Sequence, residues 1–167
     1  VPVTTIIQDK IMYSLLFGLG AVALSLLLGV PLGILMAQMK GRWLDRLGTG
    51  YIVFVVAVPA AVYYLFIQMY ITDIFKLPML FDEYNPISWI LPLLSMALAP
   101  TASYAMWMRR YMVDELNKDY IKLARAKGVK ERTLMFSHVL RNAFIPMAQY
   151  LPATILFTIA GSIYIES

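Results

Sequence analysis

Few side chains in this sequence are of the types that perform covalent chemistry or bind metal ions. Its 167 residues include no cysteine and a single histidine, His138. Zinc and iron–sulfur sites need several cysteine or histidine ligands, and a Ser-His-Asp triad would have to use His138, which lies in the most basic stretch of the chain. No segment reads GxxxxGKS or GxxxxGKT, the loop that cradles nucleotide phosphates. The sequence therefore predicts no enzyme active site, metal site or cofactor in this chain.

The most distinctive spacing belongs to two short basic motifs. The second begins ten residues after the first ends, and they read Lys122-Leu123-Ala124-Arg125-Ala126-Lys127-Gly128 and His138-Val139-Leu140-Arg141-Asn142-Ala143. A basic amphipathic segment of this kind either lies on anionic lipid or docks a soluble partner. Small alanines beside cationic side chains suit insertion into a groove of a partner protein better than adsorption to lipid. His138 is interpreted as a polar-face or packing histidine.

Two helices are predicted to position these motifs. Asn117-Lys118-Asp119 is a suitable cap for a first helix that ends near Lys127. Gly128 is expected to end it in a left-handed conformation, which glycine adopts without steric cost. The residues expected to share one face of this helix are Tyr120, Leu123 and Ala124.

A second helix is predicted to start near Lys130-Glu131, with Pro146 at the start of the span that follows. Its opposite sides differ in polarity, which is typical of a surface helix. The predicted apolar stripe is Phe136, Val139, Leu140, Ala143 and Phe144, and the predicted polar face is Ser137, His138, Arg141 and Asn142.

The composition places these helices beside a membrane. The chain is 60% apolar and 14% charged, whereas soluble domains average about 45–50% apolar and about 25% charged. A spanning helix needs about 20 apolar residues. We therefore predict an all-α, polytopic membrane helical bundle in which residues 1–167 form a single transmembrane domain. The charge-free intervals predict four spans, over residues 12–38, 48–71, 89–112 and 146–165.

The basic residues predict the orientation of these spans. Twelve of the 14 Lys and Arg lie in two stretches, residues 40–46 and 109–141. By the positive-inside rule the loops 40–46 and 113–145 face the cytoplasm, and the ends of the chain and the second loop face outside. The net charge of +4 is thus explained by topology and gives no reason to expect a nucleic-acid partner. No predicted span carries an interior charge, which argues against an ion-coupled carrier.

The two motifs, followed by Ile145-Pro146, resemble the EAA loop of ATP-binding-cassette (ABC) importer permeases. The combination of Ala-Arg-Ala-Lys-Gly with His-x-Leu-Arg-Asn-Ala is similar to the peptide/nickel group, in particular to the first permease subunit of oligopeptide and dipeptide importers. The span order from about Ile11 to Ser167 is similar too. Against the general motif, Lys122 stands for the leading Glu, Leu123 for the next Ala, and His138-Val139-Leu140-Arg141 for the Ile-x-Leu-Pro end.

The resemblance implies a type I ABC importer transmembrane fold in a multi-pass subunit of the bacterial inner membrane. Such permeases typically have six spans, so this chain would hold the second to fifth as the middle section of a longer subunit. The implied partners within the membrane are a second homologous permease and membrane lipid, and in the cytoplasm two ABC ATPase subunits that bind ATP and Mg. An extracellular substrate-binding protein is also implied. It would meet the outer loop from Asp73 to Ser88, which contains Asp82 and Glu83.

In the family the short helix of the loop, here near Asp119 to Lys127, is the coupling helix that sits in a groove of the ATPase. The residues that the resemblance assigns to this coupling loop, around Asp119 to Pro146, are Tyr120, Lys122, Leu123, Ala124, Arg125, Ala126, Lys127, Gly128, His138, Arg141 and Asn142.

The sequence thus predicts a permease subunit of an ATP-driven importer, for oligopeptides or dipeptides. Nickel chelates and other small solutes stay open as substrates, because specificity in this family resides largely in the binding protein. Two other hypotheses stay open as well. One is a non-transporting membrane scaffold whose loop anchors a cytoplasmic protein, and the other is an ion-coupled carrier with its charged site in further spans.

Overall fold

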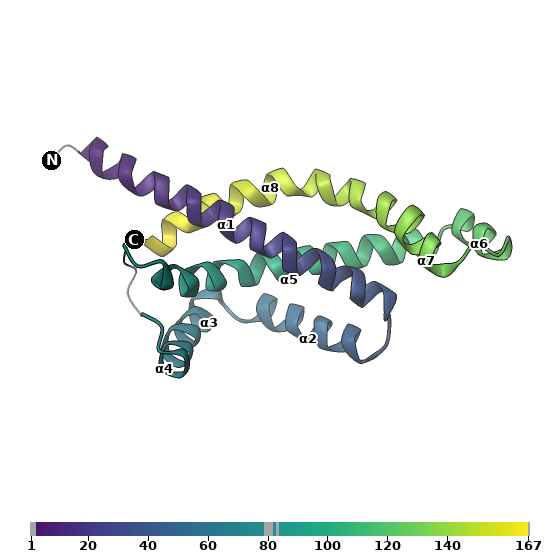
Figure 1. Cartoon of the computed structure of the whole chain (residues 1–167), viewed down its shortest axis with the longest axis horizontal. Helices are drawn as coiled ribbons and strands as arrows, with labels where there is room; N and C mark the ends of the chain where they lie inside the picture. Colours follow the sequence, from purple (N-terminus) through teal and green to yellow (C-terminus); the bar gives the residue numbers. More distant parts are fainter. Residues whose placement is uncertain (1–2, 79–81, 83, 167) are drawn as a thin grey trace.

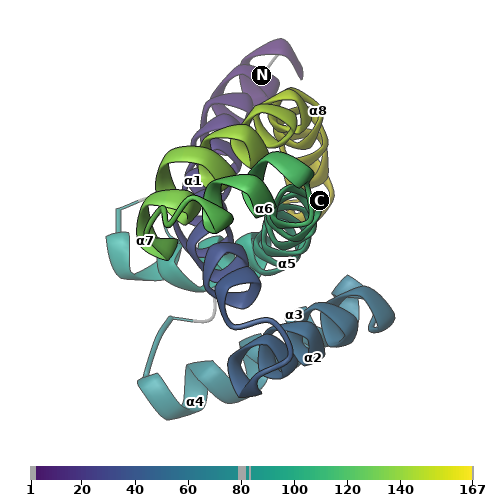
Figure 2. The same cartoon turned by 90° about the vertical axis from the view of Figure 1, so that its right-hand side faces the viewer.

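Three long helices form the body of the molecule in a computed structural model of the chain. The structure describes the backbone of residues 3–78, 82 and 84–166 and the side chains of residues 11–78, 82 and 84–157. The long helices are α1 (Val3–Gln38), α5 (Ile90–Leu116) and α8 (Leu140–Glu166). They lie side by side along the longest axis of the molecule (Figures 1 and 2). The described elements are all helical, in agreement with the predicted all-α class.

Helices α1 and α5 make the most extensive contact in the described part of the fold. Pro31 lies within α1 between Gly29 and Gly33, the small residues of a GxxxG pattern. A Cβ atom added to Gly29 would lie 2.7 Å from the carbonyl oxygen of Thr101, and one added to Gly33 would lie 2.6 Å from that of Ala105. Because both contacts are with backbone atoms, these glycines set how closely the two helices approach.

The prediction of a single helix over residues 48–71 is wrong, because the helix is interrupted at Pro59. Helix α2 (Trp43–Ala57) ends at Val58, which is extended, and α3 (Ala60–Phe66) starts after Pro59. Proline has no backbone N–H and disfavours helical geometry in the residue before it. The segments Trp43–Ala57 and Ala60–Phe75, which meet at this break, are bent by 109° relative to each other. After α3 the chain continues through a wide π turn, η1 (Ile67–Ile71), into α4 (Thr72–Phe75).

The other predicted spans fall within continuous helices. Residues 12–38 lie in α1, residues 89–112 lie in α5 and in the short 3-10 turn η2 (Pro86–Trp89) before it, and residues 146–165 lie in α8. Two described helices are long and apolar enough to cross a membrane, Ile11–Gln38 and Pro86–Leu116, and the bent pair Trp43–Ala57 and Ala60–Phe75 passes the same test when taken together. Side chains beyond Phe157 in α8 lie outside the described residues, as does Glu83 of the outer loop, so the fourth span stays a prediction.

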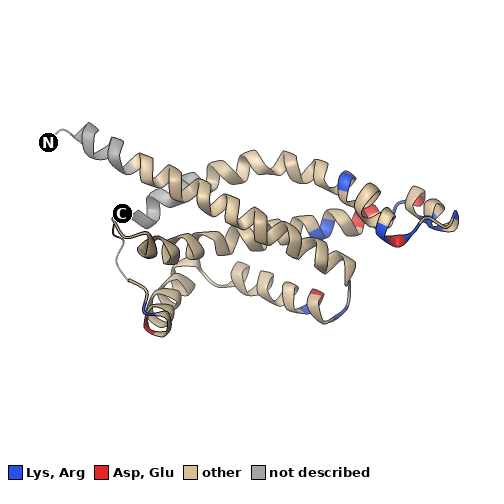
Figure 3. Ribbon diagram, in the orientation of Figure 1, with Lys and Arg blue, Asp and Glu red and all other residues tan. Residues whose placement is uncertain are grey.

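Charged side chains gather at one end of the long helices. In Figure 3 the middle of α1, α5 and α8 carries no Lys, Arg, Asp or Glu, while the end of α5, the start of α8 and the short helices α6 (Asp119–Ala126) and α7 (Glu131–Thr133) are strongly coloured. The start of α2 lies at the same end (Figure 1), and Asp45 there forms an ion pair with Arg109 of α5. The two stretches predicted to face the cytoplasm therefore lie at one end of the molecule.

Candidate functional site

The helix predicted for the first basic motif is confirmed as α6, and its end follows from Gly128. Gly128 has a φ of +81°, in the left-handed region. Its N–H donates to the carbonyl of Arg125 at 3.0 Å, and the next N–H, of Val129, donates to that of Ala124 at 3.1 Å. These two bonds form a Schellman motif, which satisfies carbonyls that the end of the helix leaves open. The chain therefore turns sharply after α6 and returns toward the membrane helices.

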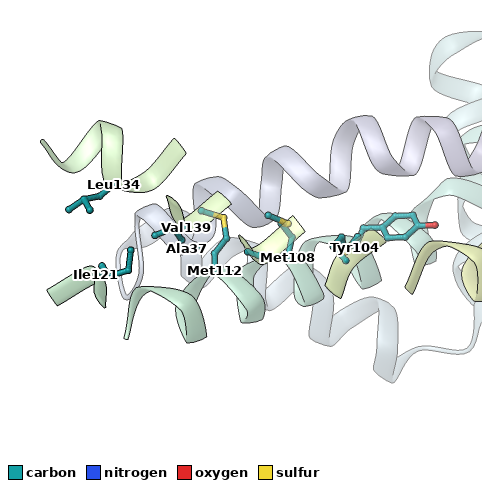
Figure 4. Close-up of a cluster of buried hydrophobic side chains, with 9 residues drawn as sticks. Ala37, Tyr104, Met108, Met112, Ile121, Leu134 and Val139 are labelled. Carbon is teal, nitrogen blue, oxygen red and sulfur yellow. The ribbon is translucent and has the colours of Figure 1, made fainter. Parts of the chain in front are cut away.

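The side of α6 that packs on the body of the molecule overlaps only in part with the predicted face, because Ala124 contacts the body and Leu123 does not. The fully buried residue of α6 is Ile121, and it belongs to an apolar cluster with Met112 of α5 and Leu134 (Figure 4). Leu123, predicted to share a face with Tyr120 and Ala124, is 57% exposed. The prediction took the face from helical spacing within the motif and missed Ile121, because tertiary contacts decide which side of a short helix is covered. The covered side leaves an outward surface on α6 that contains Lys122, Leu123, Arg125 and Ala126.

The second predicted helix is continuous with α8, and a π turn changes its buried face. Helix α7 leads into the π segment η3 (Leu134–Val139), which runs on into α8. The buried residues are spaced by five and then by four positions: Leu134, Val139, Ala143 and Met147. A π turn holds one residue more than an α turn, so the α-helical stripe predicted here is partly wrong. Val139 and Ala143 are buried as predicted, whereas Phe136 and Phe144 are exposed.

Glu115, which the sequence did not single out, joins three segments at the base of α6. It lies in the last turn of α5, and its side chain is 7% exposed. One carboxylate oxygen, Oε2, accepts a hydrogen bond from Lys118 Nζ at 2.7 Å. The other, Oε1, accepts from the Tyr120 hydroxyl and from Asn142 Nδ2, the latter at 3.1 Å, and Asn142 Nδ2 also donates to the Tyr120 hydroxyl at 2.7 Å. We call Glu115, Lys118, Tyr120 and Asn142 the Glu115 cluster.

The electrostatics of the Glu115 cluster favour its paired state. Burial raises the pKa of the Tyr120 hydroxyl, and its hydrogen bond to the Glu115 carboxylate raises it further. The hydrogen bond from the Lys118 ammonium to Glu115 raises the pKa of Lys118, and the attraction of the two charges adds to this effect. Both donors therefore keep their protons at neutral pH, and the carboxylate keeps its partners.

A second ion pair spans the turn at Gly128. Arg125 of α6 donates from Nε to Glu131 Oε1 of α7, and from Nη2 to Oε2 at 3.2 Å. The hydrogen bond from Arg125 lowers the pKa of the Glu131 carboxylate. Both side chains are largely exposed, so the pair orients α6 relative to α7 but adds little to stability.

The structure brings together some of the predicted site residues and leaves others apart. Tyr120, two residues before the first motif, is hydrogen-bonded to Asn142 of the second motif, and Lys122 pairs with Asp119 at 2.8 Å. Ala124 is half-buried against the apolar cluster and Lys127 caps α6. His138 and Arg141 are exposed on the other face of the second helix and do not contact α6 in any described hydrogen bond or ion pair. Among the described residues no group of three or more His, Asp or Glu side chains could hold a metal ion.

Sequence reasoning missed two buried carboxylates at the charged end, Asp45 and Glu115. Asp45 accepts a bidentate ion pair from Arg109, at 2.5 Å to Nε and 2.8 Å to Nη2, and the N–H of Gly41 donates to it at 2.9 Å. The available signal was charge, since Asp45 is the one acidic residue in the basic stretch 40–46 and Glu115 lies in the basic stretch 109–141. An acid surrounded by bases next to an apolar helix is a candidate for a buried ion pair. This signal does not identify the distant partners, which are Arg109 for Asp45 and Asn142 for Glu115.

The arrangement at this end of the molecule is suited to protein binding. The short helix α6 projects beyond the long helices (Figure 1), with an outward surface of cationic, small and apolar side chains. It is attached at its base by an apolar contact and by the Glu115 cluster. A displacement of α6 would therefore be transmitted to the ends of both α5 and α8.

Comparison with known proteins gives one family and a set of similar permeases. A model of the family described as binding-protein-dependent transport system inner membrane component matches residues 29–167. The chain is 34% identical to the oligopeptide transport system permease protein AmiC of Streptococcus pneumoniae over 162 residues. This alignment covers 95% of this chain and 32% of that protein. The chain is 34% identical over 169 residues to the glutathione transport system permease protein GsiC of Escherichia coli (strain K12) and of Salmonella typhimurium, which covers 99% of this chain and 54% of those proteins. The chain thus spans 32% to 54% of the length of these relatives.

Proposed function

Because the chain belongs to the family of binding-protein-dependent transport system inner membrane components, and within it to the peptide/nickel group of ABC permeases, we propose that it forms part of the translocation path of an ATP-driven peptide importer. The chain itself does not hydrolyse ATP in this proposal. ATP and Mg bind to two cytoplasmic ABC ATPase subunits, a second homologous permease completes the path, and an extracellular binding protein delivers the substrate.

One observation carries this proposal, the projecting helix α6. It stands at the charged end of the molecule, and Lys122, Leu123 and Arg125 are exposed on it. Leu123 is 57% exposed and lies two residues from the exposed Arg125, and arginine is among the residue types enriched at protein interfaces. We propose that this surface inserts into the ATPase, and that the loops 40–46 and 113–145 face the cytoplasm of a bacterial cell.

The relatives support a peptide as the substrate class. The names of the proteins similar to this chain refer to oligopeptide and to glutathione transport, and both substrates contain peptide bonds. We propose oligopeptides or short peptides as the cargo. An uptake assay that compares a labelled hexapeptide with labelled glutathione distinguishes the two classes.

A substitution on the outward surface of α6 tests the docking role. In the full-length subunit, Leu123→Asp places a charge where an apolar contact with the ATPase is proposed, so co-purification of the ATPase and hexapeptide uptake should both fall by about tenfold or more. Arg42→Asp is the matched control, because Arg42 is also exposed at the charged end but lies in the other loop. It should leave both measurements unchanged.

The outcomes of this experiment separate the proposed function from its alternatives. Normal ATPase binding and uptake by Leu123→Asp would contradict the docking role of α6. An ATPase that binds the wild-type protein without substrate-stimulated hydrolysis would favour the scaffold. Uptake that follows an ion gradient without ATP would favour the ion-coupled carrier.

A further inference from the structure

The Glu115 cluster lies where three moving parts of the proposed importer would meet. Glu115 belongs to the last turn of α5, Tyr120 to α6 and Asn142 to the first turn of α8. We propose that Glu115 is the positioning residue that transmits displacement of α6 to the membrane helices α5 and α8. This inference rests on the proposed function, in which the ATPases move α6.

The attachment of α6 to the body is of two kinds, and one of them fixes orientation. The apolar contact of Ile121 with Met112 and Leu134 is non-directional, because burial of apolar area depends little on angle. Hydrogen bonds to a carboxylate depend steeply on distance and angle and are stronger when charge-assisted. The Glu115 cluster is therefore the contact that makes α6 rotate and translate together with the ends of α5 and α8.

The cluster also shortens the mechanical path from α6 to α8. Along the backbone this path runs through the turn at Gly128, through α7 and through the π segment η3. A π segment is a place at which helices kink, and a turn outside a helix lacks the repeating hydrogen bonds of an α-helix. The hydrogen bonds from Asn142 Nδ2 to the Tyr120 hydroxyl, at 2.7 Å, and to Glu115 Oε1, at 3.1 Å, bypass all three.

The burial of Glu115 makes the connection sensitive to the charge of its partners. Its side chain is 7% exposed, so water only weakly screens a second negative charge placed against it. Two carboxylates that share one site repel each other. A cluster that is disturbed at one member is therefore expected to rearrange as a whole and to release α6 from α5 and α8.

Exchanging the carboxylate of Glu115 with the amide of Asn142 tests this role in the complete importer. The full-length subunit, its partner permease, the ATPases and the binding protein are reconstituted in proteoliposomes with a labelled hexapeptide. Asn142→Asp sets a second carboxylate against Glu115, so peptide taken up per ATP hydrolysed should fall by about tenfold or more. The double variant Glu115→Gln and Asn142→Asp restores one amide and one carboxylate with their positions exchanged, and should recover most of this ratio.

The control for the exchange is Asp114→Asn. It removes a carboxylate one residue from Glu115, but Asp114 is exposed and lies outside the cluster. This variant should keep the wild-type ratio of uptake to hydrolysis.

Three outcomes would overturn the inference. They are a wild-type ratio in Asn142→Asp, a parallel loss of uptake and hydrolysis that leaves the ratio unchanged, and failure of the double variant to recover. Failure of the proposed function is seen separately, as absence of ATPase binding or of ATP-dependent uptake in the wild-type complex.

Discussion

Asp45 and Glu115 are the two acidic residues that are buried in the described part of the chain. Both lie at the charged end, and both are held by cationic donors from a neighbouring segment. Asp45 connects the first loop to α5 through Arg109, whereas Glu115 connects α5 to α6 and α8. At the scale of single residues, two buried carboxylates therefore join the parts of this end to one another.

The ion pair of Asp45 predicts a measurable loss of stability when it is broken. Asp45→Asn removes the charge that accepts two hydrogen bonds from Arg109, so the free energy of unfolding should fall by about 1.5–3 kcal/mol. The measurement is a denaturant titration of the full-length subunit in detergent. Asp114→Asn, at an exposed position, should change the free energy of unfolding by less than about 0.5 kcal/mol. Equal effects of the two substitutions would show that the Asp45 pair adds nothing beyond a surface charge.

At the scale of elements, close packing of α1 on α5 is the feature with the clearest steric basis. Gly33 and Gly20 are both glycines of α1, but their surroundings differ. A Cβ on Gly33 would meet the backbone oxygen of Ala105 at 2.6 Å, whereas a Cβ on Gly20 would meet the side-chain Cδ1 of Leu93 at 3.0 Å. A side-chain end can move aside and a helix backbone cannot.

This difference predicts that a glycine-to-alanine substitution is destabilising at position 33 and tolerated at position 20. Gly33→Ala should lower the free energy of unfolding by about 1–3 kcal/mol, because α1 and α5 must separate. Gly20→Ala on the same helix should be nearly neutral. The two variants are compared by denaturant titration in detergent, and a neutral Gly33→Ala would contradict the close approach of the two helices.

The sequence predicted the elements whose cause is local. Helix α6 ends where Gly128 permits a left-handed turn, and the long helices follow the charge-free intervals. The corner at Pro59 also had a local cause, but Pro31 lies inside α1 and Pro100 inside α5 without a break. The positions of the prolines alone therefore could not predict which helix would be interrupted.

The elements that were missed depend on contacts between distant residues. The π turn at Leu134–Val139 places Leu134 and Val139 on one face, and spacing within the motif could not show an extra residue in a turn. The Glu115 cluster likewise combines residues that are up to 27 positions apart. Such partners follow from the packing of α5, α6 and α8.

At the scale of the whole molecule, the charged end and the opposite end should lie on different sides of the membrane. Arg42 and Arg132 are exposed at the charged end, and Tyr84, near the start of α5 at the other end, is 92% exposed. This chain has no cysteine, so single cysteines introduced into it can be labelled without background from its own residues.

Labelling with a membrane-impermeant maleimide tests this topology in the full-length subunit after any cysteines outside this chain are replaced. Tyr84→Cys should react in intact spheroplasts. Arg42→Cys and Arg132→Cys should react only after the membrane is opened, because the positive-inside rule places both in the cytoplasm. Reaction of Arg42→Cys and Arg132→Cys on different sides of the membrane would contradict the topology.

The corner at Pro59 has a consequence for hydration. Pro59 offers no N–H to the carbonyl one turn before it, so the last turn of α2 keeps backbone oxygens without a helical donor. Val56, Ala57 and Ala60 are exposed at this corner. Hydrocarbon supplies no hydrogen-bond donors, and irregular backbone at membrane depth occurs only against protein or water. If α2 and α3 lie at that depth, the corner must face another polypeptide or an aqueous cavity of the assembled complex, and lipid acyl chains are excluded from it.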